Sequence, residues 1–184
     1  MSAFELKDIA TAVKNELAAT TVFDDFKKGE VKPTRHIDTI RQDLEGQTYP
    51  GTNVEYTKRS FKLNGERVEG VFPVFKSEFT AYLPKKLWNA SDNVQFKHCI
   101  RQLSARIEID PSFAEKYTTR QIEQIKAGSP RIDGLIWHHS EIPGRMQRVD
   151  SKLHETCRHT GGRSLWGGGG DYREEDKYVE SMEF

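Results

Sequence analysis

The sequence predicts an α+β fold: a helical N-terminal part, then a small antiparallel sheet, then a C-terminal unit of two strands and a helix. Three observations support this prediction. Apolar spacing changes along the chain from helical to alternating and back, a strong hairpin turn lies between two alternating runs, and four of the six histidines fall within 22 residues. The 184 residues are enough for one domain with its own core.

The N-terminal part contains two helical patterns. In residues 3–19 the apolar residues recur at helical spacing, which predicts an amphipathic helix that packs on the core or docks on a partner. A shorter pattern begins after Thr34 and ends at Gly46, and it predicts a second helix. We therefore expect residues 1–55 to form a helical segment, as an appendage to the rest of the chain.

The period of the apolar pattern then changes to two. Apolar and polar residues alternate on both sides of Asn64-Gly65, a dipeptide that favours a type I′ hairpin because both residues tolerate positive φ. A third alternating run occupies residues 75–83. We expect one small antiparallel sheet over residues 54–83, with Pro73 at an edge or a bulge because proline has no backbone N–H to donate.

Helical spacing returns in the middle of the chain. One helix is expected to begin after Ser91. A second is expected to begin at Thr118, where Gln121 completes a capping box, and to end near Gly128.

The distribution of charge divides the chain into acidic ends and a basic body. Lysine plus arginine and aspartate plus glutamate each number 28. Residues 1–56 and 171–184 carry net charges of −3 and −4, whereas residues 57–170 carry a net charge of +7. A basic body is compatible with a nucleic-acid partner.

Cysteine content and hydropathy exclude several classes. Two cysteines, Cys99 and Cys157, cannot build a disulfide-rich scaffold or an all-cysteine zinc site, and we expect both to be free thiols. No apolar run approaches the ~20 residues that span a bilayer, so we expect no membrane insertion. The N-terminus also lacks the pattern of a signal peptide.

The residues that can carry chemistry gather between positions 133 and 162. A short apolar run ending in paired histidines predicts a strand, a Pro-Gly turn follows, and a second strand leads into a short capped helix. In order, the segments are 134–139, Pro143-Gly144, 145–149 and a helix that starts at Asp150 or Ser151 and stops at Gly161-Gly162. A hairpin packed against a helix would leave a cleft wide enough for one metal ion.

Three imidazoles of this unit could bind that ion, His138 from the strand and His154 and His159 from the helix. A spacing of five places His154 and His159 ~140° apart on an ideal helix, so His159 must lie beyond the last full turn. Neighbouring residues on a strand face opposite ways. Of His138 and His139, we therefore expect one to bind metal and the other to activate water.

This region resembles a known family of nucleases. It is similar to the WHH branch of the HNH/endonuclease VII nucleases, which occur as toxin domains of bacterial polymorphic toxins and are related to colicin-type DNases. The residues that carry the resemblance are Trp137-His138-His139, Gly144-x-Met146-Gln147-x-Val149, His154 and His159-Thr160-Gly161-Gly162.

The resemblance implies a ββα-metal (His-Me finger) site with His139 as the general base. The implied ligands of one divalent ion (Zn, Mg, Mn or Ni) are His138, His154 and His159. Gln147 occupies roughly the position of an asparagine that orients the base loop in such enzymes. The chain departs from the colicin pattern in two places: Ile136 replaces a glutamate, and the helix histidines are spaced by five rather than four.

These features predict a metal-dependent endonuclease that hydrolyses DNA with little sequence specificity and acts as an antibacterial toxin. The alternatives are an RNase of the same fold, acting for example on tRNA, and a non-catalytic zinc-binding interaction module closed by His139 or Cys157. The expected phosphate-binding residues are Arg145, Arg148, Lys152 and Arg163. The nuclease domain would span residues 56–170 with its catalytic core at 133–162, followed by an acidic flexible tail at 171–184.

The resemblance also implies a cognate immunity protein, because a non-specific nuclease would damage the cell that makes it. Complementary charge predicts an acidic inhibitor. It could plug the metal site directly or bind beside it on the basic body at residues 57–131, and we favour the second geometry. We further expect the protein to be made in the bacterial cytoplasm without a signal peptide, exported by a dedicated secretion system, and active in the cytoplasm of the target cell.

Overall fold

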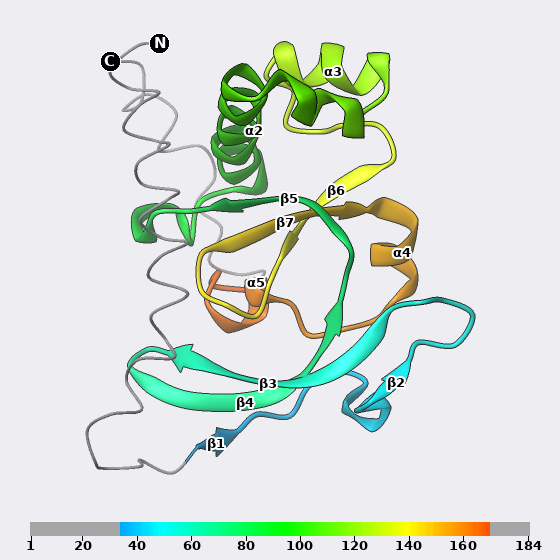
Figure 1. Cartoon of the computed structure of the whole chain (residues 1–184). Helices are drawn as coiled ribbons and strands as arrows, with labels where there is room; N and C mark the ends of the chain where they lie inside the picture. The colour runs from blue at the N-terminus through cyan, green and yellow to red at the C-terminus, as the bar shows by residue number, and fades with distance from the viewer. Residues whose placement is uncertain (1–33, 170–184) are drawn as a thin grey trace.

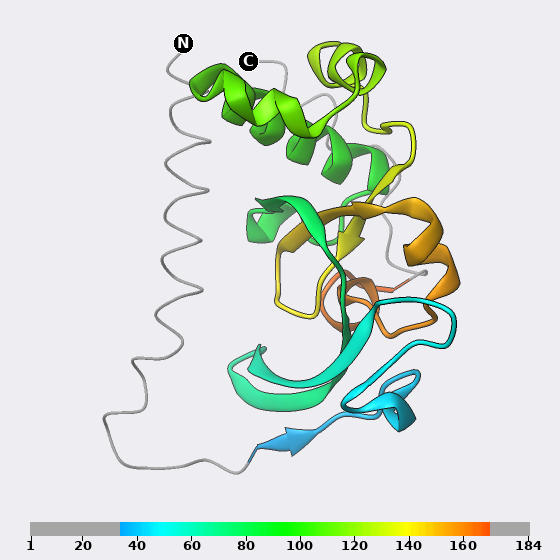
Figure 2. The ribbon, with the colours of Figure 1, turned by 45° about the vertical axis from the view of Figure 1, so that its right-hand side comes forward.

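The computed structural model describes residues 34–169, and the elements of this part stack in layers (Figures 1 and 2). Helices α2 (Asp92–Ile109) and α3 (Thr119–Lys126) cover one side of a three-stranded sheet, and a curled four-stranded sheet lies on the other side. The helix expected at residues 3–19 and the tail at 171–184 lie outside the described residues. No helix of the described part is long and apolar enough to cross a membrane.

The curled sheet contains the expected hairpin and has the strand order β1-β4-β3-β2. Its strands are β1 (Arg35–His36), β2 (Gln47–Thr48), β3 (Glu55–Leu63) and β4 (Glu66–Val74). Asn64 and Gly65 have φ values of 51° and 84°, as a type I′ turn requires. Pro73 lies beyond the two β4 residues that pair with β1, so its missing N–H faces no partner strand there, as expected for an edge position.

The helix predicted after Thr34 is wrong. This segment holds the short strand β1 and a 3₁₀ turn at Gln42–Leu44. The apolar residues that suggested a helix do not share a face, because Ile37 and Leu44 pack into different core clusters while Ile40 is 47% exposed. Helical spacing over three residues was therefore coincidental.

The three-stranded sheet has the order β5-β7-β6, with both strand pairs antiparallel. Its strands are β5 (Ser77–Tyr82), β6 (Leu135–His139) and β7 (Arg145–Asp150). The expectation of one sheet over residues 54–83 is therefore wrong in its last strand, which leaves the hairpin and pairs with β7. Alternation specifies that a strand has one buried face, but it does not specify the partner strand.

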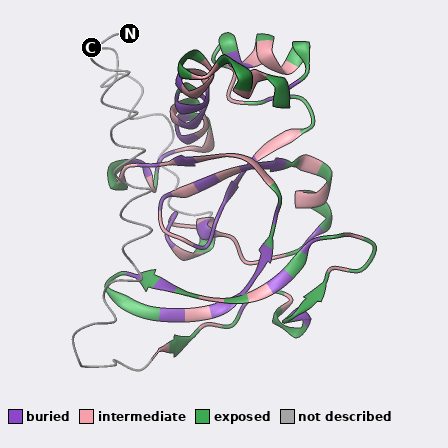
Figure 3. Ribbon diagram, viewed as in Figure 1, coloured by how far each residue is buried: buried purple, intermediate pink, exposed green. Residues whose placement is uncertain are grey.

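The two long helices begin where the sequence predicts. The Ser91 side chain accepts a hydrogen bond from the Val94 N–H at the start of α2. Thr118 and Gln121 form the expected capping box of α3, and Gly128 has the positive φ of a helix-terminating residue. Buried residues concentrate on the central strands and on the face of α2 that covers them (Figure 3).

The C-terminal unit follows the expected order of strand, turn, strand and helix, with Asp150 capping α4 (Ser151–Thr156). The predicted helix end at Gly161-Gly162 is wrong, because α4 stops at Thr156 and Gly162 instead begins α5 (Gly162–Leu165). A contact from the curled sheet explains the early stop, since the Tyr56 hydroxyl donates to the Arg158 carbonyl at 2.7 Å and holds this loop away from a helical path.

Candidate metal and catalytic site

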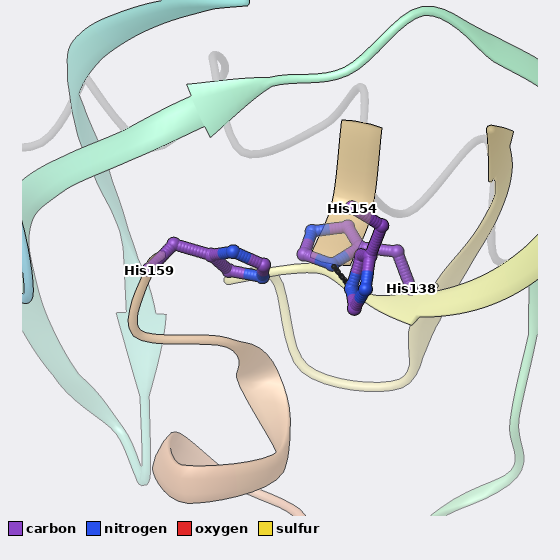
Figure 4. Close-up of side chains that lie close together, drawn as sticks. All are labelled: His138, His154 and His159. Carbon is purple, nitrogen blue, oxygen red and sulfur yellow. Dashed lines mark hydrogen bonds between the residues drawn. The ribbon is translucent and has the colours of Figure 1, made fainter. Parts of the chain in front are cut away.

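Three histidines from three different segments converge on one point (Figure 4). His138 comes from β6, His154 from α4, and His159 from the loop that follows α4. One ring nitrogen from each lies within 4.8 Å of the other two, and His138 Nδ1 is 3.2 Å from His154 Nε2. The structure thus brings together the three residues that the sequence suggested as metal ligands.

The backbone fixes which nitrogen of His159 points to the centre of this triad. His159 Nδ1 lies 2.6 Å from the Cys157 carbonyl oxygen. A carbonyl only accepts, so Nδ1 carries the proton and the lone pair of the neutral ring resides on Nε2. Such a backbone contact is a common way to set the tautomer of a metal-binding histidine.

Burial keeps the triad uncharged. Desolvation lowers the pKa of all three rings, that of His138 well below its ordinary value and that of His154 to about 4. The neighbouring imidazoles lower the pKa values of His138 and His154 further, because positive charges repel. The Phe75 ring packs on all three, with centroid distances between 5.0 and 5.5 Å. Neutral rings offer the lone pairs that a cation needs, so the donor set fits a divalent metal ion.

His139 lies on the opposite face of β6, as strand alternation requires. It is buried against the rings of Phe96 and Trp166, and its Nε2 is 2.7 Å from the Gln95 Oε1 atom of α2. The two faces of one strand therefore separate the triad from the fourth imidazole.

Gln147, which the resemblance places where an asparagine orients the base loop, lies on the face of the sheet opposite to His139. Gln147 pairs directly with His138 across β6 and β7, and directly paired residues share a face. The amide that does contact His139 belongs to Gln95, which sequence reasoning missed. The sequence did contain one indication of this role. Gln95 lies four residues before Cys99, so it is a polar residue on the apolar face of the helix.

Two of the four expected phosphate-binding residues are partly engaged within the protein. Arg145 donates from Nε to Ser140 Oγ at 2.8 Å and from Nη2 to Glu141 Oε1 at 3.1 Å. Arg163 donates to Asp92 Oδ1 at 2.7 Å. Both side chains are half-buried and would have to share these contacts with a phosphate.

The other two expected phosphate-binding residues, Lys152 and Arg148, differ in exposure. Lys152 is exposed on α4, and so is Arg158, a further basic residue in the loop that carries His159. Arg148 is only 1% exposed, and its guanidinium carbon lies 4.9 Å from the Trp137 ring centroid on the α2 side of the sheet. That burial does not fit a phosphate contact.

A glycine holds the loop after His159 against the end of β6. The Trp166 indole N–H donates to the Ser140 carbonyl at 2.8 Å, and Gly162 lies against both groups. A Cβ atom at position 162 would collide with each of them. The second glycine of the His-Thr-Gly-Gly run is thus explained by close packing at the end of the His139 strand.

A comparison with known protein families covers the residues of this site. Residues 64–161, more than half of the chain, match the family model described as the DNase/tRNase domain of colicin-like bacteriocin, and the matched region contains His138, His139, His154 and His159. No curated protein and no solved structure matches the chain significantly. The three-histidine cluster lies within the matched residues. The chain therefore belongs to the DNase/tRNase domain family of colicin-like bacteriocins, a family of nuclease toxins that hydrolyse phosphodiester bonds.

Proposed function

We propose that this chain is a metal-dependent endonuclease of the WHH type that hydrolyses DNA with little sequence specificity and acts as an antibacterial toxin. The observation that carries the proposal is the convergence of three imidazoles, one buried and two partly buried, whose pKa values are lowered by desolvation. A fourth imidazole, His139, follows His138 in the chain and lies on the opposite face of β6. In this proposal the catalytic core lies at residues 133–162, within a nuclease domain at 56–170.

Each histidine has a role in this proposal. His138, His154 and His159 hold one divalent ion, which would neutralise charge that develops on the phosphoryl and leaving oxygens. His139 accepts a proton from the attacking water, since imidazole is a suitable base near neutral pH. Gln147 pairs with His138 and so faces the triad side of the sheet, where its amide would be available to bind substrate.

Basic side chains supply affinity for the phosphate backbone. Lys152 on α4 and Arg158, next to His159 in the chain, are exposed, and Arg145 and Arg163 are half-buried. Contacts to phosphate carry no sequence information, which supports cleavage with little specificity and binding that weakens as salt rises. We leave Arg148 out of this set because it is buried.

Substitution of His139 tests the mechanism. His139→Ala should abolish nicking of supercoiled plasmid, while calorimetric titration shows zinc or nickel binding within a few-fold of the unmodified protein. His154→Ala should lose both metal binding and cleavage. The matched control is His36→Ala, an exposed histidine on β1, which should leave both intact. Normal cleavage by the His139 variant would refute the assigned base.

Parallel digests test the substrate. We expect plasmid and linear DNA to be cut under conditions in which total tRNA survives. Cleavage of tRNA with intact plasmid would refute the DNA assignment and leave the phosphodiester hydrolase assignment unchanged. Tight zinc binding without cleavage of either nucleic acid, in magnesium, manganese, nickel or zinc, would instead favour an interaction module.

We also propose that the producing cell makes an acidic immunity protein, which binds and inhibits this toxin. Lys97 and Arg101 are exposed on α2. This helix lies on the side of the three-stranded sheet opposite to the curled sheet (Figure 1). Charge reversal of both to glutamate should weaken inhibition while cleavage and metal binding persist. Inhibition that is lost only when residues 145–163 are altered would place the inhibitor on the metal site.

A further inference from the structure

We propose that Gln95 is the positioning residue for His139, and that its side-chain amide selects the tautomer of His139 that carries its proton on Nε2. This inference rests on the proposed function, in which His139 is the general base. Gln95 lies 44 positions before His139, in a helix that precedes the ββα unit.

The orientation of the Gln95 amide follows from its neighbours. Gln95 is 1% exposed, and its Nε2 lies 2.8 Å from the Leu87 carbonyl oxygen and 2.7 Å from the Trp88 carbonyl oxygen. Both carbonyls only accept, so each takes one hydrogen of the NH₂ group. A flipped amide would set its oxygen against two carbonyl oxygens, in a place where water cannot compensate. The Gln95 oxygen must therefore face His139.

The tautomer of His139 is a consequence of that orientation. Gln95 Oε1 and His139 Nε2 are 2.7 Å apart, the distance of a strong hydrogen bond. An amide oxygen cannot donate, so the hydrogen between them belongs to Nε2. In a neutral ring the lone pair then resides on Nδ1, and this is the nitrogen that can take a proton from water.

The nearby carboxylate does not explain this tautomer as well as the amide does. Asp92 Oδ1 lies 4.0 Å from His139 Nε2, beyond hydrogen-bond distance, and it accepts from Arg163 Nη1 at 2.7 Å. The Phe96 and Trp166 rings pack on the imidazole and restrict its rotation. The Gln95 amide oxygen, at 2.7 Å, is therefore the acceptor that we assign to the Nε2 proton of the restrained ring.

A methionine substitution separates this role from a packing role. Gln95→Met keeps the length of the side chain and removes the acceptor. Gln102→Met is the matched control, because Gln102 is a second buried glutamine of α2, and its amide hydrogen-bonds the backbone N–H and carbonyl of Tyr82. Both substitutions cost buried hydrogen bonds, but only the first removes the partner of His139.

The expected result is a fall in kcat without a matching change in binding. Gln95→Met should lower kcat on plasmid DNA by ~10–100-fold, the usual effect of losing a partner that orients a site residue, with KM and the zinc Kd within about threefold. Gln102→Met should keep kcat within about threefold. Long-range ¹H–¹⁵N spectra of the imidazoles should show His139 protonated on Nε2 in the unmodified protein and in Gln102→Met, and a mixture of tautomers in Gln95→Met.

The spectra test the inference even if Gln95→Met fails to fold or the proposed function fails. A proton on Nδ1 of His139 in the unmodified protein would overturn the role of Gln95, as would an unchanged tautomer and kcat in Gln95→Met. Normal cleavage by His139→Ala would instead refute the general base, and the tautomer would still report on Gln95.

Discussion

At the scale of single residues, the peptide bond between His138 and His139 separates two environments. Alternation along β6 turns one imidazole toward α4 and the curled sheet and the other toward α2. This division could be predicted from sequence, because a regular strand cannot aim adjacent side chains at one point. The contact with Gln95 could not, since nothing local specifies which helix covers the far face of a strand.

Substitution of Arg148 tests whether burial of a charged side chain lowers the stability of this protein. Desolvation lowers the pKa of its guanidinium to about 10, and none of the ion pairs among residues 34–169 includes it. A buried charge without an ion-pair partner pays a desolvation penalty of several kcal/mol, and an apolar side chain of similar size removes that penalty. We therefore expect Arg148→Met to unfold at the same or a higher urea concentration and to cleave plasmid within about twofold of the unmodified protein.

Arg158→Met is the control for this prediction, because Arg158 is exposed beside His159. Its cleavage should fall, and the slope of log KM against log salt should become shallower, as for the loss of one phosphate contact. A comparable loss of cleavage in Arg148→Met, with its stability intact, would mean that the buried arginine does reach the substrate.

At the scale of elements, features that depend on adjacent residues were predicted correctly. Features that depend on contacts between distant parts of the chain were not. The hairpin at Asn64-Gly65 and the caps at Ser91 and Thr118 depend on a few adjacent residues, and all three are present in the structure. The partner of β5 and the end of α4 depend on contacts far along the chain. The Tyr56 hydroxyl, for example, donates a hydrogen bond to the carbonyl of Arg158, 102 positions later in the chain, and no sequence pattern predicts that hydrogen bond.

The curled sheet and its leading segment position the loop that carries His159. Besides the Tyr56 hydrogen bond, the Ile40 N–H donates to Thr160 Oγ1 at 2.9 Å. The loop has no helix of its own to hold it, so these contacts set the place of the His159 ring. We expect Tyr56→Phe to lower the free energy of unfolding by ~1 kcal/mol, the typical value of one hydrogen bond, and to weaken zinc binding several-fold.

Tyr49→Phe is the control for this prediction, since the Tyr49 ring packs beside Tyr56 with 6.1 Å between centroids. It should leave the zinc Kd unchanged in calorimetric titrations. Equal zinc affinity in both variants would show that the loop keeps its position without the hydroxyl.

At the scale of the whole molecule, the hydrophobic core includes residues that precede the region matched by the family model, which begins at residue 64. One buried cluster joins Leu44, Val54 and Tyr56 to Val149 and Cys157, so residues before position 64 pack against the C-terminal unit. The prediction of an appendage at 1–55 rested on helical spacing, which gives no information on such packing. We expect the folding unit to include residues 44–56.

Desolvation of the histidine triad makes the stability of the metal-free protein depend on pH. Histidine has an ordinary pKa of 6.5, and in the folded protein the pKa of His154 is lowered to about 4, with those of His138 and His159 also lowered. As the pH falls below 6.5, the unfolded chain binds protons that the folded protein does not, so unfolding is favoured. One pKa unit corresponds to ~1.4 kcal/mol, so His154 alone accounts for up to about 3 kcal/mol of stability at neutral pH.

Urea unfolding in a chelator measures this effect. The midpoint should be highest above pH 7 and should fall steadily between pH 6.5 and about 4, and His154→Leu should flatten the curve because it removes a titrating ring. Zinc should raise the midpoint at pH 7.5, since it binds the folded triad, and should lose this effect as protons compete for the same lone pairs. A midpoint independent of pH in the chelator would mean that the three rings are hydrated in the metal-free protein, and the neutral, preformed donor set would have to be abandoned.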